Sequence, residues 1–356
     1  CISGFGNTNS NSSVASSNAE IAVLRENPAV ISNITITDCF ISCDPRGAFP
    51  TVAERRSKGS GILVMGNAFS GLVNRNYVAH SGTYGIHYNG GYDPQSVGPT
   101  QSGNTVNLQN RSWTITENQI LFGGTNTTTT TGTRSADAIN LLHCRRFVVS
   151  YNYIEDPEQV GIDVGYNADS NYVFNNSLTG FVNTSLAAPL VCIRVGLNSQ
   201  GDSIVKNHIY NNSSAQFKAG VWIDRSGIST TGVTSYDNSN NYIGENVIHD
   251  NNASAIVLST NVASVNARFN TISRNSTYDN TGLSIDLNYT NTTGPTAVTT
   301  NDNNDGDNGV NDLQNFPLID SVTVNPFGWM VIWGKAPAGS TIEFFGTDGG
   351  VNNHGG

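Results

Sequence analysis

The sequence predicts an all-β solenoid, in which short strands recur along the chain and stack into a rod, followed by a short antiparallel β segment. Three observations support this fold class. The composition is rich in Asn and poor in charge, two short phrases alternate along most of the chain, and their spacing is too short for strand–helix–strand units.

The composition disfavours helices and several classes of partner. Of the 356 residues, 48 are Asn and only 12% are charged, with a formal net charge of −10. A soluble domain usually carries about 25% charged residues, and Asn, Ser, Thr and Gly are poor helix formers. The 17 Lys and Arg residues provide no basic face for nucleic acid, and no stretch of about 20 apolar residues spans a membrane.

The first repeated phrase is an Asn, then any residue, then an apolar residue. Its copies begin at Asn76, Asn118, Asn152, Asn176, Asn207, Asn246 and Asn270, and Asp38-Cys39-Phe40 resembles an earlier copy. The second phrase is a small residue followed by apolar, variable and apolar positions. Its copies begin at Gly61, Gly85, Ala138, Gly161, Cys192, Gly220, Ala255 and Gly282.

The spacing of the two phrases indicates a stacked coil. The shortest full periods are 24 residues, from Asn152 to Asn176 and from Asn246 to Asn270. Each phrase alternates as a short strand does, and a βαβ unit needs about 30 residues or more. Two strands and a turn in 24 residues therefore predict one coil of a solenoid of roughly nine coils.

The phrases also suggest structural roles for their small and amide residues. Asn tolerates the left-handed region in turns, and Asn side chains stacked at one corner can hydrogen-bond the copies above and below. Gly or Ala before the second strand indicates a tight bend where a Cβ atom would be crowded.

This pattern resembles the right-handed parallel β-helix, or pectate-lyase-like, superfamily over roughly residues 19–290. The resemblance implies an all-β, right-handed parallel β-helix. The superfamily includes calcium-dependent polysaccharide lyases with an Arg or Lys base, and hydrolases with clustered Asp residues. The Gly-His-Gly and Arg-Ile-Lys phrases of the polygalacturonase-like hydrolases are absent from this sequence.

The repeat stops after about residue 291. A phrase that starts at Asn311, Asn-Asp-Leu-Gln-Asn-Phe-Pro, resembles a junction in large secreted bacterial β-helix proteins, where an immunoglobulin-like domain follows. Alternating apolar residues then predict antiparallel strands, but a full sandwich needs about 100 residues. We therefore divide the chain into a β-helix at 1–292, an acidic linker at 293–317, and an incomplete immunoglobulin-like sandwich or cap at 318–356.

The linker is a candidate calcium loop. Ca²⁺ prefers oxygen ligands supplied within a flexible turn, and several oxygen-bearing side chains occur within ten residues here. We expect Asp302, Asp305, Asp307 and Asn311 to ligate Ca²⁺. The alternative is a solvated, turn-rich loop, because the segment lacks the closing Glu of an EF-hand.

The variable position of the second phrase points away from the core. The resulting outward column is Leu63, His87, Asn140, Asp163, Arg194, Trp222, Val257 and Ser284. The resemblance to lyases implies Arg194, Asp163 and Asp224 as catalytic candidates. Trp222 offers an apolar platform for a sugar, so Trp222, His87 and Asn140 are carbohydrate-binding candidates. The alternative is that this column is only a solvated face.

Three functions remain open. The first is a secreted or cell-surface structural or adhesive protein, such as an adhesin or a filament or appendage subunit, because no complete catalytic set is present. The second is a calcium-dependent polysaccharide lyase or other uronan-active carbohydrate enzyme. The third is a glycan binder similar to phage tailspikes. The expected partners are accordingly a polysaccharide or cell-surface glycan, or copies of the chain itself in a homo-oligomer, in an extracellular location.

Overall fold

The computed structural model describes most of the repeat region and the segment that follows it. The described residues are 2–3, 19–24, 32–42, 59–65, 69–82, 84–90, 112–121, 137–165, 167–181, 190–196, 198–224, 238–259, 267–287, 298–302, 306 and 309–346.

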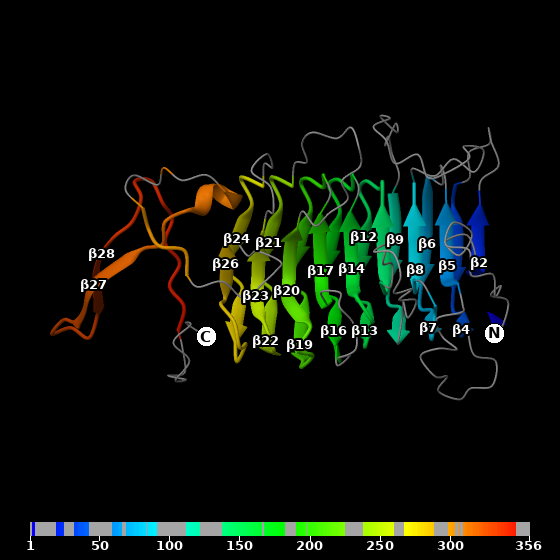
Figure 1. Cartoon of the computed structure of the whole chain (residues 1–356), viewed down its shortest axis with the longest axis horizontal. Helices are drawn as coiled ribbons and strands as arrows, with labels where there is room; N and C mark the ends of the chain where they lie inside the picture. Colours follow the sequence, from blue (N-terminus) through cyan, green and yellow to red (C-terminus); the bar gives the residue numbers. More distant parts are fainter. Residues whose placement is uncertain are drawn as a thin grey trace.

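The repeat region folds into a right-handed parallel β-helix, as the sequence predicts. Three parallel sheets of nine, eight and nine strands run along a rod (Figure 1). Every third strand in the sequence joins the same sheet, so each coil contributes one strand to each sheet. We call these sheets 1, 2 and 3 in the order in which a coil visits them.

Sheet 1 carries the second sequence phrase and holds the longest strands. It consists of β2 (Ala19–Leu24), β5 (Ser60–Met65), β8 (Ile86–Asn89), β11 (Ile139–Leu142), β14 (Val160–Gly165), β17 (Leu190–Gly196), β20 (Phe217–Asp224), β23 (Ser254–Leu258) and β26 (Ile285–Leu287).

Sheets 2 and 3 consist mostly of strands of three to five residues. Sheet 2 contains β3 (Ile34–Thr37), β6 (Ser70–Asn74), β9 (Ser112–Thr116), β12 (Val148–Ser150), β15 (Tyr172–Phe174), β18 (Ser203–Val205), β21 (Tyr242–Gly244) and β24 (Thr271–Ser273). Sheet 3 contains β1 (Ile2–Ser3), β4 (Phe40–Ser42), β7 (Tyr77–Ala79), β10 (Gln119–Leu121), β13 (Tyr153–Glu155), β16 (Ser177–Thr179), β19 (His208–Asn212), β22 (Val247–Asn251) and β25 (Ser276–Tyr278).

The core is a set of apolar stacks that run along the rod. In sheet 1, for example, Ile139, Ile162, Ile193 and Val221 occupy equivalent register positions and are completely buried. Burying one such side chain stabilises the fold by about 1.5–3 kcal/mol relative to leaving it exposed. Because each coil repeats the same inward positions, one continuous hydrophobic cluster extends along most of the β-helix.

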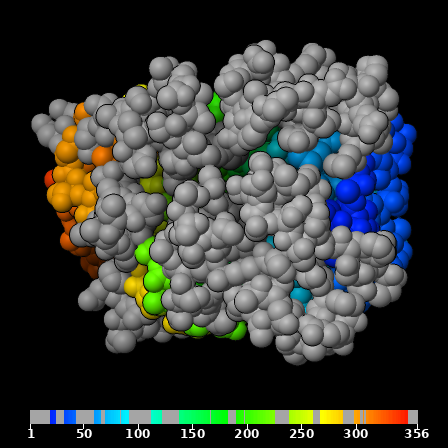
Figure 2. Space-filling model, turned by 45° about the vertical axis from the view of Figure 1, so that its right-hand side comes forward, coloured from blue at the N-terminus to red at the C-terminus, as the bar shows by residue number. Residues whose placement is uncertain are grey.

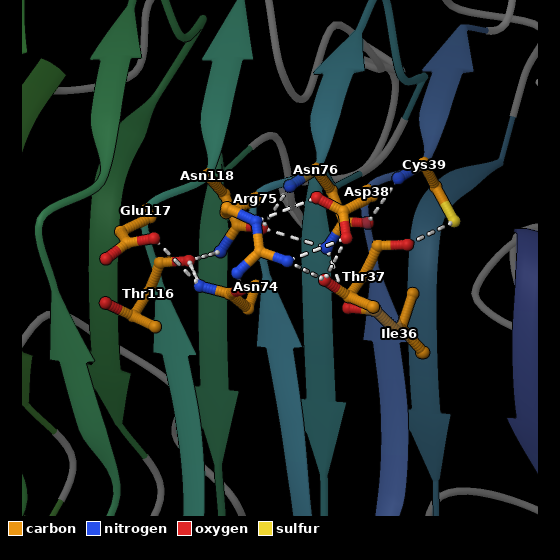
Figure 3. A network of polar contacts seen from close by, with 10 residues as sticks. All are labelled: Ile36, Thr37, Asp38, Cys39, Asn74, Arg75, Asn76, Thr116, Glu117 and Asn118. Atoms are coloured by element: carbon orange, nitrogen blue, oxygen red, sulfur yellow. Dashed lines mark hydrogen bonds and ion pairs between the residues drawn. The ribbon is translucent and has the colours of Figure 1, made fainter.

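An asparagine ladder lines the corner between sheets 2 and 3, as the repeated phrase predicts. Each Asn donates its backbone N–H and its side-chain N–H to the Oδ1 atom of the Asn in the next coil; between Asn152 and Asn176 these distances are 3.0 and 2.9 Å. The first rungs, Asn76 and Asn118, are shown in Figure 3. The ladder continues through Asn207 and Asn246.

The left-handed conformation belongs to the residue before each ladder Asn, whereas the sequence analysis assigned it to Asn itself. The backbone φ angle is 51° at Arg75, 56° at Glu117, 55° at Lys206 and 57° at Glu245. The left-handed residue lies at the bend between the strands of sheets 2 and 3, and the Asn that follows it bonds along the rod.

Several of these left-handed corner residues form ion pairs between coils. Arg75 contacts Asp38 at 2.7 Å, as Figure 3 shows. Near the other end, Glu245 lies 3.6 Å from Lys206 and 3.0 Å from Arg274. The charges therefore alternate in sign from one coil to the next at both ends of this corner.

In two copies of the first phrase, the residue that occupies the ladder position is not the one predicted. The ladder passes from Asn246 to Asn275, not to Asn270, so the last period is 29 residues. Asn270 instead accepts a bond from Asn241 in a second ladder between sheets 1 and 2. At the other end, Cys39 and not Asp38 occupies the ladder position, since its N–H donates to Asn76.

Several glycines of the second phrase pack closely against the next coil, as predicted, although some of them, such as Gly161, lie within a strand of sheet 1 and not before it. A Cβ atom on Gly161 would lie 2.5 Å from the carbonyl oxygen of Cys192 in the next coil. A Cβ atom on Gly85 would lie 2.5 Å from the carbonyl oxygen of Ala138. These distances are far below van der Waals contact, so the backbones of successive coils approach closely at these glycines.

The C-terminal segment lies at the opposite end of the rod from β1 and β2 (Figures 1 and 2). It contains a short 3₁₀ helix, η1 (Val310–Leu313), and an antiparallel ribbon of β27 (Leu318–Val324) and β28 (Met330–Lys335). Glu343 accepts hydrogen bonds from Ser273 and Arg274, which lie in and beside the last strand of sheet 2. The described residues include no helix with the length and apolarity needed to cross a membrane.

Candidate functional site on the outer face of sheet 1

The structure brings the predicted polar column together on adjacent strands of sheet 1. Strand pairing aligns His87 with Asn140, Asn140 with Asp163, Asp163 with Arg194, and Arg194 with Trp222. The five side chains therefore follow one another on five successive coils, about 4.8 Å apart between neighbouring strands.

The last residue of this column and its exposure to solvent both differ from the prediction. Val257 pairs with Asp286, so Asp286 and not Ser284 continues the column. The column is also not a solvated face, because His87, Asn140, Asp163 and Trp222 are all buried. Alternation identifies which side of a sheet a residue faces, but it does not reveal whether that side is open to water.

Asp163 and Arg194 form the centre of the site. Arg194 donates from Nε to Asp163 Oδ1 at 2.9 Å and from Nη2 to Asp163 Oδ2 at 2.5 Å, a two-point ion pair. Burial alone would lower the pKa of Arg194, but the attraction of Asp163, with further contributions from Asp137 and Asp224, raises it overall. Arg194 therefore remains a cation, and it is the most exposed member of the group, with 18% of its side chain accessible.

A second carboxyl group, which the sequence analysis missed, lies beside this pair. Asn140 donates from one amide nitrogen to Asp137 Oδ2 at 2.6 Å and to Asp163 Oδ2 at 3.2 Å. Together the two distances limit the separation of those carboxylate oxygens to about 5.8 Å. Asp137 lies just before the second phrase at Ala138, outside the alternating positions on which the sequence analysis relied.

The two carboxyl groups lie in different surroundings. Burial, reinforced by the nearby charge of Asp163, raises the pKa of Asp137 to about 7. Asp163 has the Arg194 guanidinium bound to both of its oxygens. A carboxyl that holds its proton near pH 7 beside an ion-paired carboxylate is an arrangement suited to general acid–base chemistry.

Four buried polar atoms in this group have no hydrogen-bond partner among the described residues. They are both ring nitrogens of His87, Oδ1 of Asp137 and Oδ1 of Asn140. Burial lowers the pKa of His87 to about 3, so its ring is neutral and offers one donor and one acceptor. Buried polar atoms without partners are rare in folded proteins, so this group is a candidate site for a polar ligand.

Trp222 and Asp224 lie at the other end of the column. The Trp222 indole N–H donates to Ser259 Oγ at 2.7 Å, and Ser259 Oγ donates to Asp224 Oδ1 at 3.4 Å. Trp222 packs with Val191, Ala219 and Val257 in a small apolar cluster separate from the main core. Its ring is buried, so it lies within the covered part of this face.

The candidate calcium ligands fall into two groups. Asp302 accepts a hydrogen bond from the Gly306 N–H at 2.9 Å. Asn311 extends the second ladder, because its Oδ1 accepts from the Asn270 N–H and its Nδ2 donates to the Asn270 carbonyl at 2.7 Å. Asp305 and Asp307 lie outside the described residues, so the calcium site stays a prediction.

No family model and no curated protein matches the chain. Among solved structures, the chain is similar to a double mutant of the periplasmic alginate epimerase AlgG, with 17% sequence identity and a TM-score of 0.43. The match covers 74% of this chain and 58% of that protein. A likeness of this degree bears on neither the substrate nor the activity of this chain.

Proposed function

We propose that the outer face of sheet 1 binds an acidic polysaccharide and cleaves it by acid–base catalysis. The observation that carries this proposal is the pair of carboxyl groups, Asp137 and Asp163, bridged by Asn140 beside the partly buried guanidinium of Arg194. The protein then acts outside the cell or at its surface, where such polymers occur.

The polar atoms of the site match the chemistry of a uronic acid. A sugar ring presents several hydroxyl groups that both donate and accept hydrogen bonds, and the unpartnered atoms of His87, Asp137 and Asn140 supply complementary groups. The Arg194 cation attracts the carboxylate of a uronate. Its raised pKa excludes it as a proton acceptor near neutral pH, so in this proposal Arg194 binds the anion and the base is a carboxylate.

The two carboxyl groups take different roles. Asp137, protonated below about pH 7, donates a proton to the oxygen of the leaving sugar. Asp163, whose two oxygens accept hydrogen bonds from Arg194, acts as the base or nucleophile. Asp224 contributes negative charge near Arg194, and Trp222 lies next to Arg194 on the neighbouring strand.

The test is turnover of a panel of uronic-acid polymers and neutral polysaccharides, followed by the release of reducing ends. The rate is expected to fall as the pH rises through about 7, because Asp137 then loses its proton. Asp137→Asn and Arg194→Ala should each lower the rate at least about 100-fold, the usual contribution of a positioned acid. Asp38→Asn makes the same chemical change at an exposed corner outside sheet 1 and should leave the rate unchanged.

The products identify the reaction class. Unsaturated sugar ends indicate elimination, as in a lyase, and saturated ends indicate hydrolysis. Equal turnover by the parent and Asp137→Asn would contradict the assigned acid.

A structural or adhesive role is the second candidate. It is supported by the exposed apolar side chains of the β27–β28 ribbon, including Trp329, Met330 and Trp333, because contiguous exposed apolar surface often marks an interaction site. Absence of turnover with every polymer, together with ordered assemblies in electron micrographs, would favour this candidate over the enzyme.

A further inference from the structure

Two histidines face each other on the outer surface of sheet 3, away from the outer face of sheet 1. His208 lies in β19 and His249 lies in β22, the neighbouring strand. Their Nε2 atoms are 2.8 Å apart. His208 is exposed and His249 is partly exposed, so both rings can be reached from solvent.

Tyrosine rings hold both imidazoles in place. The His208 ring stacks on Tyr210, with centroids 4.3 Å apart and an interplanar angle of 23°. The His249 ring stacks on Tyr278 in the next coil, with centroids 4.6 Å apart and an angle of 4°. The two imidazoles are therefore preorganised, so bringing their nitrogens together costs little further side-chain entropy.

The second ring nitrogen of His249, Nδ1, has a carboxylate partner. His249 Nδ1 lies 2.6 Å from Asp250 Oδ2, which places the proton on Nδ1 and leaves Nε2 as the lone-pair nitrogen of a neutral ring. Metal-binding histidines usually have this arrangement, in which a carboxylate fixes the tautomer and makes the ligating nitrogen more basic.

The distance between the two nitrogens suits a shared metal ion. Imidazole nitrogens bind Zn²⁺ at about 2.0–2.1 Å in tetrahedral geometry, which places two ligating nitrogens roughly 3.3 Å apart. The observed separation is 2.8 Å, so a small rotation of either ring would admit the ion. Without metal, the same two atoms form a single hydrogen bond.

We propose that His208 and His249 form a surface binding site for an imidazole-preferring divalent cation, Zn²⁺ or Cu²⁺. Imidazole ligands favour these ions over Ca²⁺ and Mg²⁺. Among the described residues, no group of three or more His, Cys, Asp or Glu side chains is placed to hold a metal ion. The remaining coordination positions are therefore open to water or to an anionic group of a bound molecule.

The test uses the untagged 356-residue chain, because an affinity tag of histidines would itself bind these ions. Isothermal titration with Zn²⁺ should show one site, and His208→Ala and His249→Ala should each weaken binding at least about tenfold. Asp250→Asn should weaken it about 10- to 100-fold, the usual effect of removing the carboxylate behind a ligating histidine. His143→Asn, a change at a turn that keeps the left-handed conformation accessible, is the matched control and should bind as the parent does.

A spectroscopic measurement identifies the ligand atoms directly. Electron paramagnetic resonance of the protein with one equivalent of Cu²⁺ should show coupling to two imidazole nitrogens, and the His208→Ala/His249→Ala double variant should lose it. The proposal is overturned if the parent binds neither ion, or if the double variant, with an unchanged melting temperature, binds as tightly as the parent.

Discussion

Asp202 places a carboxyl group in a ladder of amides, and this makes the effect of Asp202→Asn predictable. Asp202 is fully buried in the second ladder, between Asn171 and Asn241. Its Oδ1 accepts the backbone and side-chain N–H groups of Asn171 at 2.8 and 2.9 Å. Its Oδ2 has no hydrogen-bond partner among the described residues.

The neighbouring rung shows what an amide does at this position. Asn241 donates from Nδ2 to Asn270 Oδ1 at 3.0 Å. An ionised Asp202 cannot donate in this way, but a protonated Oδ2 can replace the amide nitrogen as donor. Burial raises the pKa of Asp202 well above its usual range, in agreement with a proton held in the folded state.

The sign of the pH effect follows from proton binding. Below about pH 4 Asp202 is protonated in both the folded and unfolded states, so it adds no pH dependence. Above that pH the folded protein keeps a proton that the unfolded chain has lost. The free energy of unfolding then falls by up to about 1.4 kcal/mol per pH unit until the folded carboxyl also titrates.

Asp202→Asn removes this dependence and supplies a permanent donor. Denaturant unfolding of both proteins between pH 4 and pH 8 should therefore show curves that diverge as pH rises. The variant should be the more stable protein at pH 7, by at most about 4 kcal/mol from this linkage. Asp279→Asn, at an exposed left-handed turn position, should show no such divergence. Parallel curves for Asp202→Asn and the parent would refute the protonated carboxyl.

Two further predictions concern the main ladder and the linker. Asn176 bonds Asn152, Asn207 and the Val149 carbonyl, so Asn176→Ala leaves buried partners unsatisfied and should lower the free energy of unfolding by roughly 2–4 kcal/mol. Denaturant titration measures this, and a cost below about 1 kcal/mol would mean that the ladder adds little stability. If the linker binds Ca²⁺, adding a chelator should lower the melting temperature, and Asp302→Ala should abolish that shift. A parent protein whose melting temperature does not change with chelator argues against the calcium loop.

The fold was predictable because its repeating contacts are encoded by residue type. A ladder rung needs an amide and a tight bend needs a residue without a large side chain, so both recur visibly in the sequence. One copy of the first phrase was assigned to the wrong ladder, because both ladders are built from Asn residues. Asn270 begins an Asn-x-apolar phrase, whereas Asn275 is followed by Ser276 and Thr277. The strand pairing of Ser276 with Val247 nevertheless shows that the ladder to sheet 3 passes through Asn275.

The candidate site was predictable only in part, for a physical reason. Residues at alternating positions of one sheet must align from coil to coil, so His87, Asn140, Asp163 and Arg194 could be grouped from spacing alone. Asp137 enters the group through a side-chain hydrogen bond at the edge of a strand, and no periodicity marks such a contact. Burial of the outer face depends on contacts that the alternation of one sheet does not encode.

The ion-paired corner has a consequence for how the rod folds. Every rung of the asparagine ladder offers the same donors and the same acceptor, so the ladder cannot distinguish correct stacking from a chain that has skipped a coil. The left-handed residues beside it can, because Lys206, Glu245 and Arg274 alternate in charge. A skipped coil would bring Lys206 against Arg274 and replace attraction by repulsion. Although each exposed pair adds only about 0–1 kcal/mol, these pairs give successive coils an order that the ladder itself lacks.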